Sequence, residues 1–215
     1  MNEYFKIKDN CRRGLIKYLE SACIKLPRSD NLNILDIGCG TGVPTIWLVE
    51  NFSGNITAID KDKESINYLQ QKIIEKDLQN RIKTLCTSFS KFKSESDFYD
   101  IILAEGFLNI VGFESGFKRI KGIIKKKGYL VIHDEYKDHN KKLEFINENK
   151  CTLIDTLYLD ENVWWDDYYR QLEIEIGKIS FPKLNELFKR DIEEIKYYKT
   201  SPSLFRSIYY IIMKN

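Results

Sequence analysis

The chain has 215 residues, a length that suits one domain with a full hydrophobic core. Hydrophobic residues make up 43% of it and charged residues 31%, as in an ordinary soluble globular protein. The formal net charge is only +2, and lysines alternate with acids along the chain. This pattern argues against a dedicated nucleic-acid surface, which normally shows a concentrated basic face.

Membrane and secretion signals are missing from the sequence. No apolar run reaches the roughly 18 residues of a membrane span, and the first six residues lack the apolar core of a signal peptide. The five cysteines are scattered and form no Cys-x-x-Cys pair, which fits reduced thiols better than disulfides or zinc. We therefore expect a cytoplasmic protein, a monomer or homodimer, with neither a membrane nor a nucleic acid as partner.

The first two thirds of the chain alternate predicted helices and strands. The helices carry apolar residues at three- and four-residue steps, and the strands are short and apolar throughout. The predicted helices are Tyr4–Leu26, Val43–Asn51, Ser65–Asp77 and Phe117–Lys126, the last with lysines in its final turn and Gly128 after it. The predicted strands are Asn33–Ile37, Ile56–Ile59, Ile82–Cys86, Tyr99–Ala104 and Tyr129–Ile132. This alternation indicates an α/β fold with a mostly parallel sheet covered on both faces.

The pattern changes after Lys141. The elements predicted there are a short helix at Leu143–Asn149, a strand at Cys151–Leu159, a helical stretch at Asn162–Lys199 broken near Phe181, and a strand at Ser207–Met213. We expect the last two strands to form an antiparallel edge on a Rossmann-like, doubly wound sheet of seven strands. The prediction is one domain over residues 1–215, with an N-terminal helical cap at 1–30 and a helical insertion at 160–200 over the active site.

A glycine loop follows the first predicted strand. Gly38, Gly40 and Gly42 occupy alternate positions after Asp36, and a helix begins shortly afterwards. Glycine tolerates positive φ and lets a ligand lie against bare backbone, and the helix start offers unpaired N–H groups. The acid before the loop disfavours a pyrophosphate and favours an ammonium group. Asp60 ends the second strand, where a carboxylate can accept both hydroxyls of a ribose. Together these residues predict a nucleoside ligand with an amino-acid tail.

The segment Ile34–Gly42 resembles the first motif of class I S-adenosylmethionine-dependent methyltransferases, and Asp60 matches the ribose-binding acid of that family's second motif. The resemblance implies S-adenosylmethionine as the cofactor. It implies that Asp60 and Lys61 face the ribose and adenine, and that Asp36, Gly38 and Gly40 face the methionine part. Cys39 belongs to the same cofactor-binding loop, where its side chain is expected to be small filler. Ser88 stands where the family often has an Asp near adenine, with Phe89 beside it. Glu105, at the end of the fourth strand, is either a surface acid or a contact to the methionine tail or substrate.

A second resemblance is narrower. The segments Asp100–Glu114 and Trp164–Tyr169 resemble a bacterial and archaeal small-molecule branch of the same family. The functional interpretation of the aromatic residues in the second segment is a lid over an apolar or cationic substrate. The expected members of this substrate pocket are Tyr4, Asn109, Trp164, Trp165, Tyr168 and Tyr169. The helical spacing of the inserted aromatic residues is equally compatible with core packing. The residues after the fourth strand lack the Asn/Asp-Pro-Pro-Tyr/Phe pattern, which disfavours amino methylation of bases in nucleic acid.

The chemistry expected from the resemblance is an in-line transfer of a methyl group to a small molecule. His133 and Glu135 follow the fifth strand and are candidates for a general base. The chain has two histidines, and the family does not usually need a metal, so no metal is expected. Two alternatives stay open. One is a nicotinamide-dependent dehydrogenase, which the glycine spacing and Asp36 disfavour, and the other is a cofactor-binding partner or sensor that performs no transfer.

Overall fold

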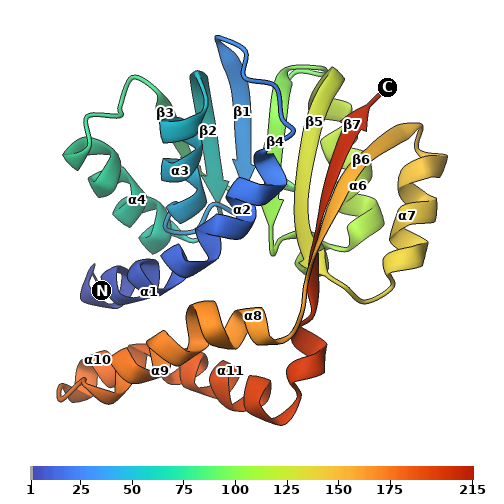
Figure 1. The fold of residues 1–215 in the computed structure, drawn as a ribbon. Helices are drawn as coiled ribbons and strands as arrows, with labels where there is room; N and C mark the ends of the chain where they lie inside the picture. Colours follow the sequence, from blue (N-terminus) through green and yellow to red (C-terminus); the bar gives the residue numbers. More distant parts are fainter. Residues whose placement is uncertain (1) are drawn as a thin grey trace.

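A seven-stranded sheet forms the centre of the molecule (Figure 1). The computed structural model describes residues 2–215. The strand order is β3-β2-β1-β4-β5-β7-β6. The strands are β1 (Leu32–Ile37), β2 (Gly54–Asp60), β3 (Ile82–Cys86), β4 (Tyr99–Glu105), β5 (Ile124–Glu135), β6 (Cys151–Leu159) and β7 (Ser207–Lys214). β1 to β5 pair in parallel, and β7 runs antiparallel to both β5 and β6. The predicted mostly parallel sheet with an antiparallel C-terminal edge is therefore confirmed.

Helices cover both faces of this sheet because its strands are apolar on both sides. The helices along the main part of the chain are α2 (Ile16–Cys23), α3 (Val43–Asn51), α4 (Lys63–Glu75), α5 (Leu108–Val111), α6 (Phe113–Ile123) and α7 (His139–Glu148). One core contains residues of α2, α3 and α4, and the other contains residues of α5, α6 and α7. Strand order reverses between β1 and β4, and ligands of such sheets bind beside the strand ends at that point.

The remaining helices lie beyond the carboxyl ends of the strands (Figure 1). They are α1 (Asn2–Arg12) with the 3₁₀ turn η1 (Arg13–Leu15), then α8 (Asn162–Trp164), the π-helical turn η2 (Trp165–Tyr169), α9 (Arg170–Gly177), α10 (Pro182–Leu187) and α11 (Lys189–Thr200), followed by the 3₁₀ turn η3 (Pro202–Phe205). The segment between β6 and β7 has its own small core, which includes Tyr169, Leu172 and Phe188 and also takes in Cys11 of α1. α1 thus packs against the segment between β6 and β7 and also lies near the sheet.

One predicted helix boundary is wrong. The helix expected to reach Lys126 ends at Ile123, and β5 begins at Ile124. Ile124 is 2% exposed and pairs with Tyr99 of β4, so the tertiary pairing overrides the good helix propensity of the lysines that follow. Lys125 lies in this strand and its Nζ is 2.8 Å from Oδ1 of Asp100. The lysines therefore belong to the start of a strand and do not end a helix.

The first predicted helix, Tyr4–Leu26, is interrupted by η1 at Gly14. A Cβ at Gly14 would lie 2.2 Å from the carbonyl oxygen of Asp167 in η2, closer than atoms can approach. Glycine is required there because the N-terminal helices and the segment after β6 touch backbone to backbone.

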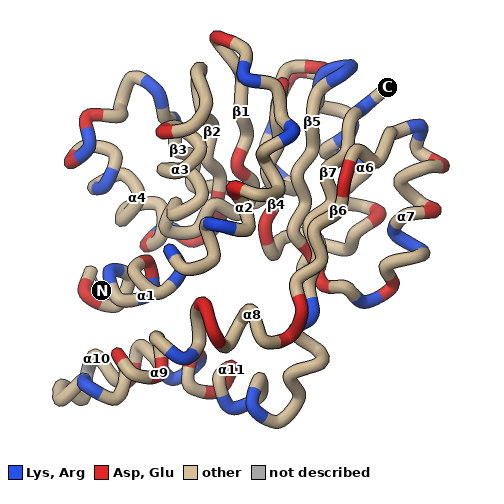
Figure 2. The backbone as a smooth tube through the Cα atoms, in the orientation of Figure 1, with Lys and Arg blue, Asp and Glu red and all other residues tan. Residues whose placement is uncertain are grey.

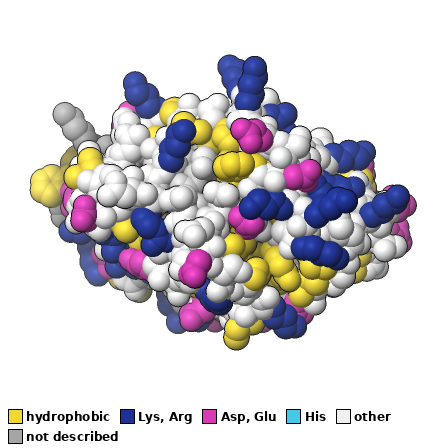
Figure 3. Space-filling view, turned by 90° about the horizontal axis from the view of Figure 1, so that it is seen from above, with side chains coloured by type: hydrophobic (Ala, Val, Ile, Leu, Met, Phe, Trp, Pro, Cys, Tyr) yellow, Lys and Arg dark blue, Asp and Glu magenta, His cyan; other side chains and the backbone are white. Residues whose placement is uncertain are grey.

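Charges of both signs are distributed over the whole molecule. Lys and Arg alternate with Asp and Glu along the backbone (Figure 2), and acidic side chains stand among the basic ones on the face turned away from α1 and the insertion (Figure 3). Among the helices of residues 2–215, none is long and apolar enough to cross a membrane.

Candidate active site

The glycine loop takes the backbone conformation that its sequence predicts. Gly38, Gly40 and Gly42 have φ values of 73°, 52° and 81°, in the left-handed region that favours glycine. The N–H groups of Gly38 and Cys39 donate to the carbonyl of Ile59 at 2.9 and 3.1 Å, which fixes the loop to β2. A Cβ at Gly40 would meet nothing within 4 Å, so bare backbone borders open space at this point.

Asp36 places a buried carboxylate beside the loop. Its residue is 2% exposed, and the hydroxyl of Thr45 on α3 donates to Oδ2 at 2.6 Å. Burial raises the pKa of Asp36 to about 7, although the Thr45 hydrogen bond acts in the opposite direction. A carboxylate that burial makes costly to ionise gains most from a cation placed against it.

Asp60 holds the glycine loop through its carboxylate. Its two carboxylate oxygens accept hydrogen bonds from the N–H groups of Gly40 at 2.9 Å and Asp62 at 2.8 Å. Asp62 caps α4 by accepting from the N–H groups of Glu64 and Ser65. The acid at the end of β2 therefore positions both the loop and the start of α4.

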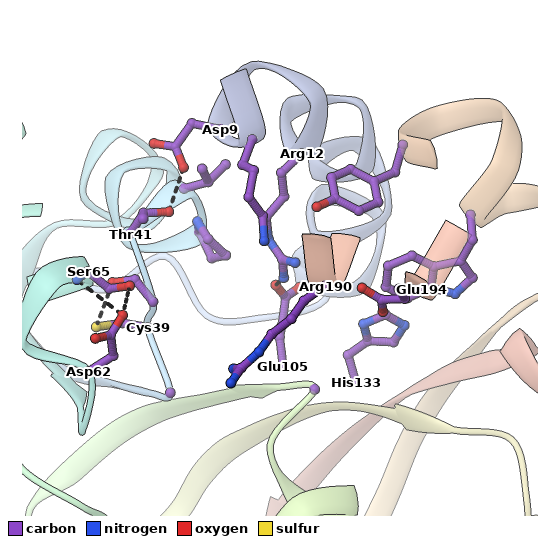
Figure 4. Close-up of a pocket in the computed structure, with 18 of the residues that line it drawn as sticks. Asp9, Arg12, Cys39, Thr41, Asp62, Ser65, Glu105, His133, Arg190 and Glu194 are labelled. Carbon is purple, nitrogen blue, oxygen red and sulfur yellow. Dashed lines mark hydrogen bonds and ion pairs between the residues drawn. The ribbon is translucent and has the colours of Figure 1, made fainter. Parts of the chain in front are cut away.

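A cleft of about 950 Å³ runs along the carboxyl ends of the strands. Ligand pockets measure roughly 300–1,000 Å³, so this cleft has room for two small molecules side by side. Its walls come from the glycine loop, the ends of β4 and β5, α1, and the insertion (Figure 4). The predicted site residues that line it are Tyr4, Asp36, Gly38, Cys39, Gly40, Glu105, Asn109, His133, Glu135, Trp164, Tyr168 and Tyr169.

The other predicted site residues lie outside the cleft lining; they are Asp60, Lys61, Ser88, Phe89 and Trp165. Phe89 is buried and packs edge to face on Phe107, with ring centroids 5.5 Å apart. Trp165 stacks on Tyr198 at 5.9 Å in the insertion core. These two aromatic side chains pack against other aromatic rings, and neither borders the cleft.

A polar stripe on α1 faces the cleft at four-residue spacing: Tyr4, Lys8 and Arg12. The Tyr4 hydroxyl donates to Asp191 of α11 at 3.0 Å, and Lys8 Nζ is 2.7 Å from the same carboxylate. Arg12 Nη2 is 3.3 Å from Glu105 Oε2. Sequence reasoning missed Lys8 and Arg12; the repeat of polar residues on one helix face was the available signal.

Glu105 is held on two sides. It accepts a hydrogen bond from the hydroxyl of Tyr209 on β7 and pairs with Arg12. Burial, together with the Glu105 charge, raises the pKa of Tyr209 well above its usual value, so the tyrosine stays a donor. Glu105 thereby ties the end of β4 to both β7 and α1.

Asp9, also missed from the sequence, joins α1 to the glycine-loop side of the cleft. Its carboxylate accepts from the Thr41 hydroxyl in the loop and from Lys72 Nζ on α4 (Figure 4 shows the Thr41 contact). α1 therefore has polar contacts to the loop at one point and to the insertion at another.

His133 lies between aromatic rings at the end of β5. It stacks on Tyr209 at 4.2 Å and faces Trp164 at 6.0 Å, with interplanar angles of 7° and 10°. Its Nε2 is 2.9 Å from Oγ of Ser207. Burial lowers the pKa of His133 to about 4, so the ring is neutral near pH 7. Its neighbour Glu135 accepts from the Asn109 amide at 3.4 Å.

The chain matches the family model described as Methyltransferase domain over residues 28–175. A ribosomal RNA small subunit methyltransferase G of Malacoplasma penetrans is 27% identical over 172 residues, which cover 77% of this chain and 68% of the relative. An (S)-tetrahydroprotoberberine N-methyltransferase of Eschscholzia californica is 24% identical over 134 residues, covering 61% of this chain but only 37% of the relative. The chain therefore spans about two thirds of the first relative and less than half of the second.

Among solved structures, an S-adenosylmethionine-dependent methyltransferase of Geobacter sulfurreducens in complex with S-adenosyl-L-homocysteine superposes with a TM-score of 0.71. The two share 14% identity, and the match covers 93% of this chain and 90% of that one. The family match extends over more than half of the chain and includes the glycine loop. The chain therefore belongs to the methyltransferase-domain family of class I S-adenosylmethionine-dependent methyltransferases.

Proposed function

We propose that this enzyme transfers the methyl group of S-adenosylmethionine to a small-molecule acceptor held between the N-terminal helical cap (residues 1–30) and the helical insertion (160–200). The observation that carries the proposal is the single cleft that reaches from the glycine loop to the insertion. α1 contacts both of these walls through Asp9 and Lys8. An acceptor enclosed in this way is sheltered from water beside the cofactor site.

The residues around the glycine loop fit the cofactor. Bare backbone at Gly40 and Gly106 borders open space, since a Cβ at either would meet nothing within 4 Å. We assign the ammonium group of the methionine part to Asp36, whose buried carboxylate has Thr45 as its hydroxyl donor. Each carboxylate oxygen of Asp60 accepts one backbone N–H and keeps a lone pair for a ribose hydroxyl. In the same proposal Gly38, Cys39 and Glu105 contact the methionine part. The adenosine extends beyond the cleft lining to Lys61 and Ser88, which follow β2 and β3, and the buried Phe89 supports that end through its packing on Phe107.

When bound, the cofactor supplies a methyl group already activated on a sulfonium. The chain's own contribution is to hold the acceptor close and on axis, which is worth roughly 7–11 kcal/mol in well-oriented reactions. The aromatic side chains Trp164, Tyr168 and Tyr169, with Tyr4 opposite, form the wall for the acceptor. Trp165 is assigned to the support of this wall through its stack on Tyr198.

His133 and Glu135 are the proposed proton acceptors. Nδ1 of His133 has no hydrogen-bond partner in the described part of the chain, and the neutral ring can take a proton there. Its lowered pKa makes it a weak base, so this role suits an acceptor that becomes acidic as the methyl group arrives. Glu135, which is more exposed, lies at the cleft mouth beside Asn109.

The proposal of a small molecule in place of RNA is supported by the mixed surface charge (Figures 2 and 3) and by the helices that cover the cleft. The test is to incubate the purified protein with methyl-labelled S-adenosylmethionine and either a low-molecular-weight metabolite fraction or total RNA. Label in the small-molecule fraction supports the proposal. Label confined to RNA, or label in neither fraction from a protein that binds S-adenosylhomocysteine, would overturn it.

We also propose that the enzyme works in the cytoplasm. All five cysteines are free thiols and four of them are buried, which suits a reducing compartment.

A further inference from the structure

Most acidic side chains that line the cleft are already occupied by donors within the chain. Glu105 accepts from Arg12 and Tyr209, and Glu194 of α11 accepts from the Tyr169 hydroxyl at 2.9 Å. The same holds for Asp9, Asp36, Asp62 and Glu135, whereas Asp134 pairs with Lys142 through Oδ2 and its buried Oδ1 has no partner among the described residues. Glu64 of α4 and Glu186 of α10 are the exceptions among the described lining residues. Most carboxylates of the cleft lining therefore already have a donor within the chain.

Arg190, unlike most of these acidic side chains, has no partner of opposite charge within residues 2–215. It is the second residue of α11, lines the cleft, and forms no ion pair within residues 2–215. Glu186 lies nearby in the chain, on α10, and no ion pair joins it to Arg190. Figure 4 shows the Arg190 side chain extending from α11 into the pocket. An exposed guanidinium without an ion-pair partner among residues 2–215 thus borders the cleft.

Tyr168 adds a second unused donor. It belongs to η2, lines the cleft, and is 7% exposed, yet its hydroxyl has no hydrogen-bond partner among the described residues. The hydroxyl is reached by solvent from the cleft, so it is free to donate to a bound molecule. Burial raises the pKa of Tyr168 to about 12, with Lys8 and Arg12 acting to lower it and Asp191 and Glu194 to raise it, so the hydroxyl keeps its proton and stays a donor.

Arg190 and Tyr168 together indicate the chemical class of a ligand that could pair with both. A guanidinium donates through a planar fork that matches the oxygens of a carboxylate or phosphate, and a phenol adds a third donor. We propose that the methyl acceptor carries an oxyanionic group, a carboxylate or a phosphate, which Arg190 and Tyr168 bind at the insertion end of the cleft. This inference rests on the proposed function and names the class of its substrate. The anchored anion leaves the rest of the acceptor directed toward the glycine loop.

The test uses the full-length protein saturated with S-adenosylhomocysteine and three probes of similar shape: benzoate, phenyl phosphate and the neutral benzamide. Calorimetry or ligand-observed NMR should show at least one of the two anions binding tenfold or more tightly than benzamide. The tighter of the anions identifies the oxyanion as carboxylate or phosphate. Arg190→Gln should lose at least tenfold in anion affinity, and Tyr168→Phe should lose threefold or more.

The matched control is Lys196→Gln. Lys196 is a cation on the same helix that lines a separate outer groove and not the cleft, so its loss should leave anion affinity unchanged. Equal affinity of the wild type for benzoate, phenyl phosphate and benzamide would overturn the inference. Unchanged anion affinity in both Arg190→Gln and Tyr168→Phe would do the same.

A further arm asks whether Arg190 serves the cofactor. S-adenosylhomocysteine has an amino-acid carboxylate and 5′-methylthioadenosine does not, so a cofactor role of Arg190 would affect only the first. Because the inference assigns Arg190 to the acceptor, Arg190→Gln should bind both as the wild type does. Loss of affinity for S-adenosylhomocysteine alone would assign Arg190 to the cofactor and overturn the inference while leaving methyl transfer intact. A wild type that binds no S-adenosylhomocysteine would instead overturn the proposed function, and this inference with it.

Discussion

The two walls of the cleft are built in different ways. The glycine-loop wall is made of backbone: positive-φ glycines, N–H groups of Gly38 and Cys39 on a carbonyl of β2, and Asp60 beneath them. The opposite wall is made of long side chains on helices, joined by ion pairs such as Lys8 with Asp191. Backbone geometry can change only if the sheet changes, whereas side chains can be exchanged on an unchanged helix. The first wall therefore suits an invariant cofactor, and the second suits the choice of acceptor.

The contrast makes Asp36→Ala the variant with the largest expected effect on the backbone-built wall. Removing one partner of a buried charge pair costs about 2–5 kcal/mol, so the affinity for S-adenosylhomocysteine should fall at least about thirtyfold in calorimetry. Asp100→Asn, in the same sheet and paired with Lys125 away from the cleft, is the control and should bind as the wild type does. Unchanged affinity in Asp36→Ala would remove the carboxylate from the cofactor assignment.

Gly14→Ala is expected to lower methyl transfer without lowering cofactor affinity. The new Cβ would lie 2.2 Å from a backbone oxygen of Asp167, which forces η1 and η2 apart at a cost of about 1–3 kcal/mol. Methyl incorporation into the acceptor fraction should fall about tenfold, while affinity for S-adenosylhomocysteine stays within twofold. Gly122→Ala, on α6 with open space around it, is the control. Equal losses of binding and transfer would show that the walls do not act separately.

The affinity for S-adenosylhomocysteine should depend on pH through Asp36. Burial is the main cause that raises its pKa to about 7; Glu105 and Asp60 raise it further, and Thr45 and Arg12 lower it. The carboxyl group is therefore mostly protonated at pH 6. The ammonium group requires the ionised form, so affinity should rise about tenfold from pH 6 to pH 8. His133 titrates near pH 4 and is silent in this window. A flat profile in the wild type, or the same slope in Asp36→Asn, contradicts the assignment.

The same shift makes a prediction for folding stability without ligand. A raised folded-state pKa means that the protonated acid is favoured in the fold, so its contribution to stability is present below pH 3.8 and is lost as pH rises through about 7. Asp36→Asn should therefore melt at a higher temperature than the wild type at pH 8, with a smaller difference at pH 4. A larger gain in melting temperature at pH 4 than at pH 8 would contradict the raised pKa of Asp36.

The smallest expected effect belongs to the side-chain-built wall. Tyr169→Phe removes one hydrogen bond to Glu194, worth about 1 kcal/mol of unfolding free energy in urea denaturation. Affinity for S-adenosylhomocysteine should not change. Tyr197→Phe, an exposed tyrosine whose hydroxyl has no partner among the described residues, serves as control and should unfold as the wild type does. A loss of cofactor affinity in Tyr169→Phe would show that the insertion also shapes the cofactor side.

The sequence predicted the sheet and the glycine loop because both depend on local patterns. Strands that are apolar throughout can only be buried, and three glycines behind Asp36 can only form a tight loop. The boundary at Ile124 failed because lysines favour helices and the pairing with Tyr99 is not visible in the local sequence.

The other wall was harder to predict. The aromatic residues Trp164, Tyr168 and Tyr169 were expected in the cleft and do line it, yet Arg12 and Arg190 were not identified. Charged residues at helical spacing look the same whether their face meets solvent or a cleft. Whether such a helix face borders solvent or a cleft depends on how the insertion packs beyond the carboxyl ends of the strands. Composition and periodicity do not encode that packing.

The double attachment of α1 has a consequence for the timing of turnover. Asp9 holds this helix to the loop through Thr41, and Lys8 holds it to α11 through Asp191. A movement of α1 that opens the cofactor side therefore also loosens the acceptor side. The spent cofactor and the methylated product would then share one exit event, and the rate at which α1 lifts would set an upper limit on the number of catalytic cycles per second.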